Sequence, residues 1–315
     1  MSRFKKATRK QLKLRMALDG PSGSGKTLTS LRFAFALGKR VAVIDTENRS
    51  ASKYQGDSPD GITFDFDVLE LANYAPTEYT AAIIEAGREG YDVLLIDSLT
   101  HAWAGEGGAL DIKDKQGGNS FTAWAKVTPM HRRMIDAILS SPCHVLATMR
   151  SKTDYVLEET TDEHGRKRSI PRKIGMAPIQ RDGMEYEFDV YGSMDWAHTL
   201  TITKSRCQSL ADAIAVKPGA SFMEPVIHWL ETGEVVRPSE AKPDSIPAYG
   251  ISEDQLAAIE TLLVQGKFPR DRALTKLQEK YGVADFGLLT ATAAEEIIGQ
   301  LKAKVSVPVP QSNGK

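Results

Sequence analysis

Long apolar runs are missing from this chain, and cysteine is scarce. No stretch approaches the ~18 uninterrupted apolar residues that a membrane-spanning helix needs, and the N-terminus has no apolar segment of signal-peptide length. Cys143 and Cys207 are the only two cysteines, and their separation fits no metal-ligand spacing. Two unclustered cysteines suit a reducing compartment. We therefore expect a cytoplasmic protein without a membrane partner.

The chain also lacks a large net charge of either sign. The chain has 40 basic and 41 acidic residues, for a formal charge of −1. No overall field therefore favours nucleic acid, and binding of that kind must use local patches. Residues 1–15 are an exception, because they carry seven basic residues and no acid. Such an arm suits either contact with nucleic acid or a solvated tail.

The strongest signal that is present is a glycine-rich segment, GPSGSGKT. It fits the pattern G-x-x-x-x-G-K-[ST] of a phosphate-binding P-loop. Apolar residues alternate before it, which predicts a strand, and recur at helical spacing after it, which predicts a helix. Glycines let backbone N–H groups close around phosphate oxygens, and a helix N-terminus adds a favourable dipole. The residues predicted to bind nucleotide are Gly20, Pro21, Ser22, Gly23, Ser24, Gly25, Lys26 and Thr27.

A second motif predicts where magnesium binds. The apolar run at 91–98 (YDVLLIDS) is typical of a Walker B strand, whose terminal carboxylate, here Asp97, holds Mg²⁺ through its water shell. Lys26 is expected to reach the β- and γ-phosphates, and the Thr27 hydroxyl to bind Mg²⁺. The expected cofactors are therefore ATP and Mg²⁺.

A P-loop ATPase also needs a group that orients or deprotonates the attacking water. In AAA+ enzymes a glutamate directly follows the Walker B aspartate, but Ser98 occupies that position here. Glu47 is the better candidate, because it follows the short apolar run at 41–45 and the carboxyl ends of neighbouring parallel strands converge on the nucleotide crevice. The alternative is that Glu47 is a solvated loop acid.

The remaining patterns predict an α/β domain followed by a small helical one. Residues 104–120 are polar and glycine-rich, which predicts a loop. Residues 154–160 and 167–173 flank a glycine turn, which predicts a β-hairpin with a basic second arm. Helices are expected over 77–89, 121–139 and 222–230, and strands over 62–66, 143–149, 186–192, 198–204 and 210–216.

Composition divides the chain into five parts. Capping-box signals at Ser252 and Thr292 mark helix starts in the last third, after a segment with three prolines. The predicted parts are a basic arm (1–11), an ATPase domain (12–232), a linker (233–249), a small helical domain (250–304) and a loose tail (305–315).

Three segments together resemble RecA-family recombinases. In that family a catalytic glutamate follows the second core strand, as in VIDTE (43–47), and the Walker B strand ends in Asp-Ser, as in DVLLIDS (92–98). TITKSR (201–206) resembles the family's late strand, which ends in a Lys-x-Lys or Lys-x-Arg pair. The layout is most similar to phage-encoded RecA-like ATPases of the Sak type, associated with single-strand annealing and recombination, and the similarity covers roughly residues 12–232.

This resemblance implies a RecA-like P-loop core with a mainly parallel central sheet, and an ATPase that acts on single-stranded DNA in a host cytoplasm. It implies that Lys204 and Arg206 reach the γ-phosphate held by a neighbouring subunit, and hence a homo-oligomer, either ring or filament. Residues 250–304 are similar to tails of phage recombination proteins, which implies contact with a single-strand-binding or replication protein. DNA contacts are expected from the 104–120 loop and the hairpin, at Lys113, Lys115, Tyr155, Arg166, Lys167, Arg168, Arg172 and Lys173.

Two departures from RecA bear on this expectation. RecA's strand after the Walker B region ends in Asn-Gln, which couples nucleotide to DNA, whereas this chain has Thr148-Met149-Arg150. Coupling then runs through Thr148 or Arg150, or is absent. The family's N-terminal polymerisation helix is also not evident, which leaves filament formation open.

Three other functions compete with this one. A helicase loader or assembly motor would use the same ATPase but act through protein contacts. A small-molecule kinase is disfavoured, because the hairpin matches a kinase lid poorly and Glu47 suits activation of water. A partition-type ATPase usually has an extra lysine early in the P-loop, where this chain has Pro21.

Overall fold

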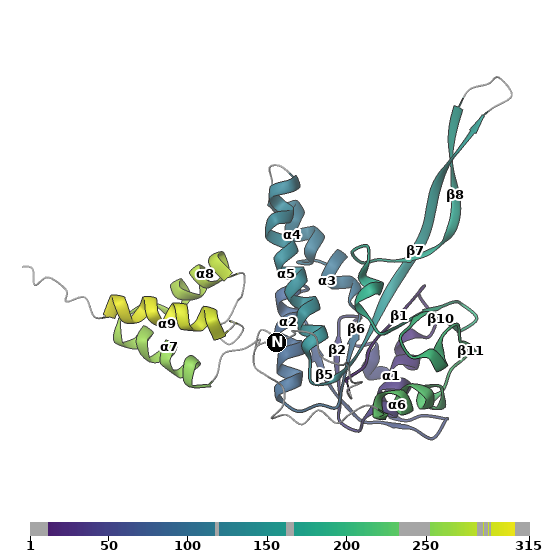
Figure 1. Ribbon diagram of the computed structural model, residues 1–315, viewed down its shortest axis with the longest axis horizontal. Helices are drawn as coiled ribbons and strands as arrows, with labels where there is room; N and C mark the ends of the chain where they lie inside the picture. Colours follow the sequence, from purple (N-terminus) through teal and green to yellow (C-terminus); the bar gives the residue numbers. More distant parts are fainter. Residues whose placement is uncertain are drawn as a thin grey trace, which may run out of the picture.

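The computed structural model describes residues 12–116, 120–161, 167–232, 253–281, 286, 289 and 291–305. They form an α/β domain and a separate group of C-terminal helices (Figure 1). The predicted fold class, an α/β core with a mainly parallel central sheet and helices after it, is confirmed. No helix among these residues is long and apolar enough to cross a membrane.

The α/β domain is built on one large sheet. Its strand order is β11-β10-β9-β1-β7-β6-β2-β5, with β8 paired to the outer part of β7. The strands from β5 to β9 in this order pair in parallel, whereas β10 and β11 pair antiparallel. The bounds are β1 (Arg15–Gly20), β2 (Val41–Asp45), β5 (Phe66–Glu70), β6 (Val93–Asp97), β7 (His144–Thr161), β8 (Lys167–Pro178), β9 (Val190–Met194), β10 (Thr199–Ser205) and β11 (Ile214–Val216).

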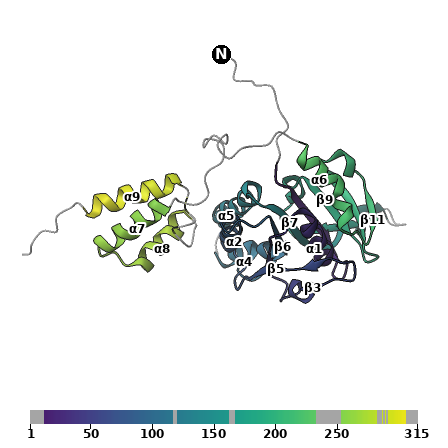
Figure 2. The same ribbon diagram turned by 90° about the horizontal axis from the view of Figure 1, so that it is seen from below.

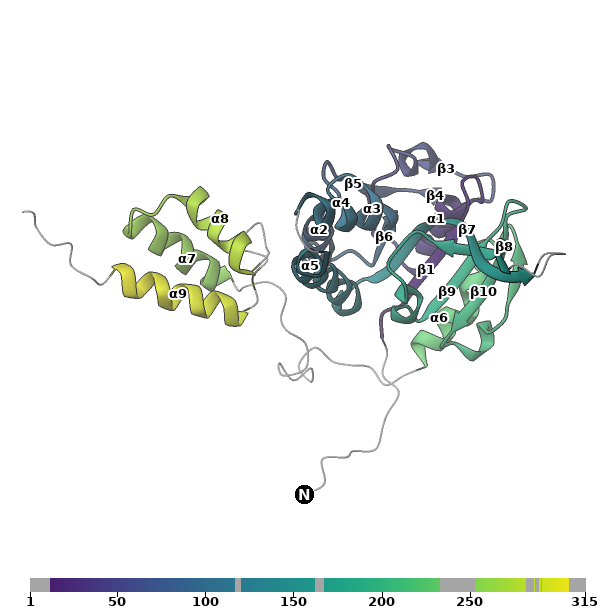
Figure 3. The ribbon, with the colours of Figure 1, turned by 90° about the horizontal axis from the view of Figure 1, so that it is seen from above.

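Helices cover both faces of this sheet, which explains why its strands read as continuous apolar runs. Met16 and Leu18 of β1 belong to the core beneath α1 (Lys26–Leu37) and α6 (Glu224–Glu231), whereas Ala17 belongs to the core beneath α2 (Pro76–Arg88) and α5 (Ser120–Ser140). Successive side chains of a strand point to opposite faces, so both cores draw on the same strand. The helices around the sheet can be followed in Figures 2 and 3.

The predicted loop at 104–120 is largely helical instead. It holds the end of α3 (Thr100–Ala104) and all of α4 (Ala109–Lys115), while 117–119 lie outside the described residues. The Gly107 N–H donates to the Asp111 carboxylate (2.7 Å), and Ala109 is fully buried. A carboxylate in the first turn and a buried alanine stabilise a helix that the glycine content concealed.

The predicted strand at 143–149 and the first arm of the hairpin are one continuous strand, β7. Between Met149 and Asp154 no glycine or proline interrupts it, and Ser151 pairs with Pro178 of β8. The hairpin prediction is confirmed for both arms, with its turn at 162–166 outside the described residues. Figure 1 shows this ribbon of β7 and β8 extending well beyond the body of the sheet. The ribbon is therefore a direct extension of a central strand.

The other strands differ from prediction mainly in their bounds. The range expected to be one strand, 62–66, holds the short strand β4 (Thr63–Phe64), which pairs with β3 (Gly56–Asp57), and only the first residue of β5, which pairs with β2 in the large sheet. Two 3-10 turns, η2 (Met184–Glu187) and η3 (Gln208–Leu210), occupy the starts of the strands expected at 186–192 and 210–216, so β9 and β11 begin later than expected. Two more are η1 (Ala51–Tyr54), which precedes β3, and η4 (Ala220–Met223), which precedes α6.

The C-terminal helices are α7 (Glu253–Gln265), α8 (Arg270–Tyr281) and α9 (Ala291–Val305). Their core includes Ile259, Leu263, Leu277 and Phe286, all at most 3% exposed. The predicted arm, the linker and the tail beyond Val305 lie outside the described residues. The five-part division of the chain stays a prediction.

Candidate functional site

The P-loop connects β1 to α1 with backbone conformations that favour glycine. Gly23 and Gly25 have φ of 80° and 89°, in the left-handed region. A Cβ atom at Gly20 would lie 2.5 Å from the Met194 carbonyl oxygen, so no larger residue fits there without a shift of backbone. The loop predicted from the sequence therefore has the backbone that a phosphate cradle requires.

Lys26 lies across this loop. Its ammonium group donates to the carbonyl oxygens of Gly20 (2.9 Å) and Pro21 (2.8 Å). Burial lowers the pKa of Lys26, and the negative charges of Asp97 and Glu47 oppose that shift. Phosphate oxygens are stronger partners for an ammonium group than neutral carbonyls, so a bound polyphosphate is able to take over these hydrogen bonds.

The two predicted magnesium ligands face each other. The Thr27 hydroxyl donates to Asp97 Oδ2 (2.7 Å), and the Thr148 hydroxyl donates to Asp97 Oδ1. Asp97 is 2% exposed, and burial raises its pKa while these two hydrogen bonds lower it. A hydroxyl and a carboxylate beside a P-loop are the oxygen ligands that suit Mg²⁺ bound together with phosphates. The site therefore fits the cofactors expected from the sequence, with Thr27 and Asp97 as the residues that would hold the ion.

Glu47 lies just beyond β2 and is held by two side chains. Ser98 Oγ donates to Glu47 Oε1 (2.9 Å), Arg150 Nε donates to the same oxygen (2.8 Å), and a second Arg150 nitrogen pairs with Oε2. The Glu47 side chain is only 18% exposed. Asp45 fixes the turn by accepting from the Glu47 N–H (2.7 Å). Glu47 is thus an ordered carboxylate beside the Walker B residues, and its role as the base stays a prediction.

Opposing effects set the charge of Glu47. Burial raises its pKa, but the hydrogen bonds from Arg150 and Ser98 outweigh that effect and hold the pKa below its ordinary value. The carboxylate is therefore ionised at neutral pH, as an acceptor for a water proton must be.

Changing Arg150 to Ala is expected to move the acid limb of the pH–rate profile to higher pH. Removal of the guanidinium leaves burial of Glu47 without its main compensation, so the folded-state pKa rises and the base is protonated at a higher pH. The measurement is kcat/KM for ATP against pH. Arg49→Ala is the matched control, because Arg49 makes a similar ion pair with Glu70 (2.8 Å). An acid limb that does not move would show that Arg150 does not set the ionisation of Glu47.

A group of buried hydrogen bonds, not foreseen from the sequence, positions Ser98. Thr46 Oγ1 accepts from the Ser98 N–H (2.9 Å) and contacts His101 Nδ1 (2.8 Å), while the Tyr79 hydroxyl donates to the Ser98 carbonyl (3.0 Å). The His101 ring stacks on Tyr74 with centroids 4.9 Å apart. Since Ser98 donates to Glu47, these residues orient the candidate base indirectly, through Ser98. No local pattern in the sequence marks Tyr79 or His101.

Within the described part of the chain, the hydrogen bonds and ion pairs of Lys204 and Arg206 involve residues outside the P-loop. The Lys204 ammonium donates to three backbone carbonyls, those of Glu185 (3.0 Å), Tyr186 (2.7 Å) and Phe188 (2.7 Å). Arg206 is 60% exposed and pairs with Asp189 (2.8 Å). A bulge between Ile202 and Lys204 interrupts the pairing of β10 with β9. Action of this pair on a neighbouring subunit stays a prediction, and Arg206 is the more available of the two.

The predicted DNA contacts fall into two groups. Lys113 and Lys115 lie on α4 and pair with Asp114 and Asp111, each at 2.7 Å. The others belong to the ribbon, apart from Arg166, which lies outside the described residues. There the register pairs Lys167 with Thr161, Arg168 with Thr160, Arg172 with Val156 and Lys173 with Tyr155. No acidic residue stands directly opposite a cation in this described register.

Comparison with known proteins shows which family this chain belongs to. The solved structures that are similar to this chain include the RadB recombinase (14% identity, 64% of this chain, 85% of that chain, TM-score 0.39) and a prototypical ATPase from the type III secretion system of pathogenic bacteria (12%, 93%, 80% and 0.31). No curated protein matches the chain. Residues 12–213, more than half of the chain, match the family AAA_24, described as an AAA domain. The protein therefore belongs to the AAA_24 family, and its core is a P-loop ATPase domain.

Proposed function

We propose that this protein hydrolyses ATP in response to single-stranded DNA, and that it acts in recombination or annealing of a phage or related element. The main structural support for this proposal is the path of β7. This strand contacts the candidate catalytic residues and then continues directly into the basic ribbon (Figure 1).

Three residues of β7 contact the site in succession. Thr148 donates to Asp97, Arg150 to Glu47, and Ser151 Oγ to Asp19 Oδ2 (2.8 Å). Three residues after Ser151, the strand's pairing with β8 shifts register between Asp154 and Tyr155. A displacement of the ribbon would therefore move Thr148, the partner of Asp97, and Arg150, the partner of Glu47, because both residues lie on the same continuous strand.

The second arm of the ribbon, β8, leads back to the same site residues. After β8, the Ile179 N–H donates to the Arg150 carbonyl (2.7 Å), and Gln180 Nε2 donates to the Leu99 carbonyl (2.9 Å). Leu99 follows the Walker B residues directly and its N–H donates to the Thr148 carbonyl (3.0 Å). Both ends of the ribbon are thus fixed beside Asp97 and Glu47. Gln180 is buried, which suits a residue that holds this junction together.

The residues divide the chemistry among them. Lys26 and the loop backbone bind the phosphates, and Thr27 and Asp97 hold the Mg²⁺ that neutralises phosphate charge when it is bound. Glu47 accepts a hydrogen bond from the attacking water and takes its proton. While Arg150 occupies both carboxylate oxygens of Glu47, that acceptor is engaged, so release of Arg150 through β7 would activate hydrolysis.

Changing Arg166, Lys167 and Arg168 together to Ala is expected to weaken binding to single-stranded DNA and to flatten its salt dependence. Each lost phosphate contact removes a released counterion, so three contacts reduce the slope of log K against log salt by about 2. The measurement is a fluorescence titration with an oligonucleotide across a salt series. Basal ATP hydrolysis should persist, because Lys26, Glu47 and Asp97 are unchanged.

The matched control removes three exposed cations elsewhere, Lys39, Lys53 and Arg132, and so changes net charge equally. It should leave the slope unchanged. An equal effect of both variants would mean that net charge, and not the ribbon, governs DNA binding. Unchanged affinity of the ribbon variant at every salt concentration would exclude the ribbon and favour a loader that acts through protein partners.

A further inference from the structure

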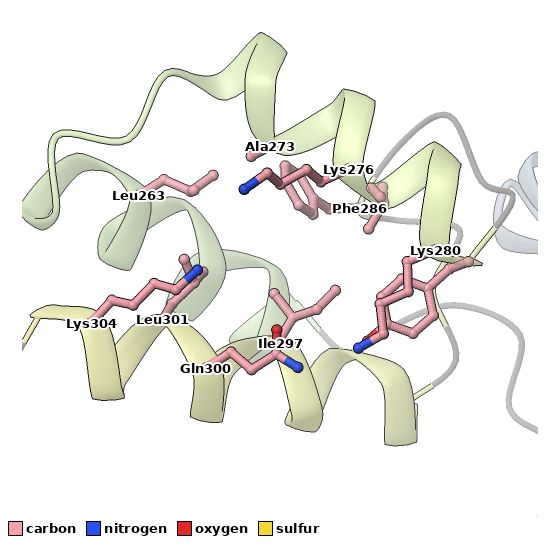
Figure 4. A pocket seen from close by; sticks show the side chains of 11 residues that line it. Leu263, Ala273, Lys276, Lys280, Phe286, Ile297, Gln300, Leu301 and Lys304 are labelled. Atoms are coloured by element: carbon pink, nitrogen blue, oxygen red, sulfur yellow. The ribbon is translucent and has the colours of Figure 1, made fainter.

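The C-terminal helices carry a groove of about 520 Å³ between α7, α8 and α9. Its floor is apolar, with Leu263 and Leu277 buried at 3% exposure each. Ala273, Ile297 and Leu301 line it as well and are only half-buried (Figure 4). Partly exposed aliphatic side chains that share one hollow are typical of a surface that another molecule covers.

The charges around this groove are of one sign. All three charged residues that line it are lysines, namely Lys276, Lys280 and Lys304. Lys280 is bonded to Glu296 (2.7 Å), whereas Lys276 and Lys304 have no acidic partner within the described part of the chain. Residues 253–305 contain eight acidic and seven basic residues, so the lysines at the groove do not reflect a general surplus of positive charge.

We propose that this groove binds an amphipathic helix of a partner protein, with apolar residues on one side and acidic residues flanking them. In Figure 4 the side chains of Lys276 on α8 and Lys304 on α9 extend over the space between the two helices. A helix laid there would cover Ala273, Ile297 and Leu301 with its apolar side. Its acidic residues would meet the two lysines at the rim, which fixes orientation and speeds association.

Charge complementarity favours an acidic protein segment over nucleic acid. Nucleic-acid sites combine longer tracks of cations with exposed aromatic rings on which bases stack. Here most of the apolar lining is aliphatic, and the Phe286 ring is only 2% exposed. The Tyr281 ring also lines the groove, but its hydroxyl is bonded to Glu296 (2.8 Å).

The test uses the full-length protein and a fluorescein-labelled helical peptide with aspartates on one side and leucine, isoleucine and phenylalanine on the other. Fluorescence anisotropy is expected to show saturable binding. Changing Lys276 and Lys304 together to Glu should raise Kd by about tenfold, since two exposed charge pairs become repulsive. Ile297→Ala should also raise Kd, because it removes apolar contact.

Lys302→Glu and Arg272→Glu combined are the matched control, because these exposed cations lie on the same two helices but do not line the groove. That control should bind the peptide like wild type, and thermal melts should show that all variants stay folded. The proposal is overturned if the peptide does not bind, if a version with lysine in place of aspartate binds equally well, or if the two double variants behave alike. Displacement of the peptide by an oligonucleotide from the wild-type groove would make nucleic acid the occupant and would also overturn it.

Discussion

Replacing Glu47 by Gln is expected to slow ATP hydrolysis by about 10²–10⁴-fold while ATP still binds. Glutamine has the size of glutamate and can still accept a hydrogen bond from Ser98, so the surrounding structure should persist. It cannot take a proton from water, which is the step assigned to Glu47. Single-turnover hydrolysis measures the loss, and a titration with a fluorescent ATP analogue shows that binding remains.

Two variants make this result specific. Lys26→Ala should lose nucleotide binding itself, because Lys26 is the cation at the P-loop. Glu70→Gln should behave like wild type, because Glu70 ends the neighbouring strand β5 and pairs with Arg49 at the surface. Wild-type turnover by Glu47→Gln would place the base elsewhere and weaken the RecA-like assignment.

Replacing Arg206 by Ala is expected to lower ATP hydrolysis by about 10³–10⁵-fold if Arg206 acts on ATP held by a neighbouring subunit. The exposed guanidinium of Arg206 suits such a role, since its only described ion pair, with Asp189, lies at the surface. Lys204 is different, because its ammonium group satisfies three backbone carbonyls. Lys204→Ala should therefore lower the melting temperature as well as activity.

Mixed oligomers separate a shared site from a local ion pair. Neither Arg206→Ala nor Glu47→Gln assemblies should hydrolyse ATP well, but mixtures should regain activity where an intact Glu47 meets an intact Arg206. Asp189→Asn is the control, since it breaks the ion pair and keeps the arginine. No recovery in verified mixed oligomers, together with an equal loss from Asp189→Asn, would make Arg206 a structural residue.

The parts of this protein that sequence predicts best are those fixed by local pattern. The strand before the P-loop, the helix α1 after it and the Walker B strand depend on glycine spacing and on apolar patterns, and the structure has them at the expected places. The same local reasoning failed at α4, where glycines on either side concealed a helix. It also divided β7 in two, because polarity rises at Arg150 although the strand continues.

Local sequence patterns could not predict the contacts that connect the site to the ribbon. Arg150 and Glu47 are 103 residues apart, and Gln180 and Leu99 are 81 apart. They meet because β7 lies between β1 and β6 in the sheet, an order that side-chain pattern alone does not determine. The sequence indicated Arg150 as one of two residues through which nucleotide could be coupled to DNA, but no pattern in it indicated Glu47 as the partner of Arg150.

In the function proposed above, single-stranded DNA on the ribbon controls hydrolysis at Glu47 through β7. The test is the steady-state ATPase rate with and without a single-stranded oligonucleotide, at saturating ATP and Mg²⁺. It compares wild type with the variant in which Arg166, Lys167 and Arg168 are changed to Ala. We expect DNA to raise the wild-type rate and to leave the variant at its basal rate. A wild-type rate that is the same with and without DNA would contradict it.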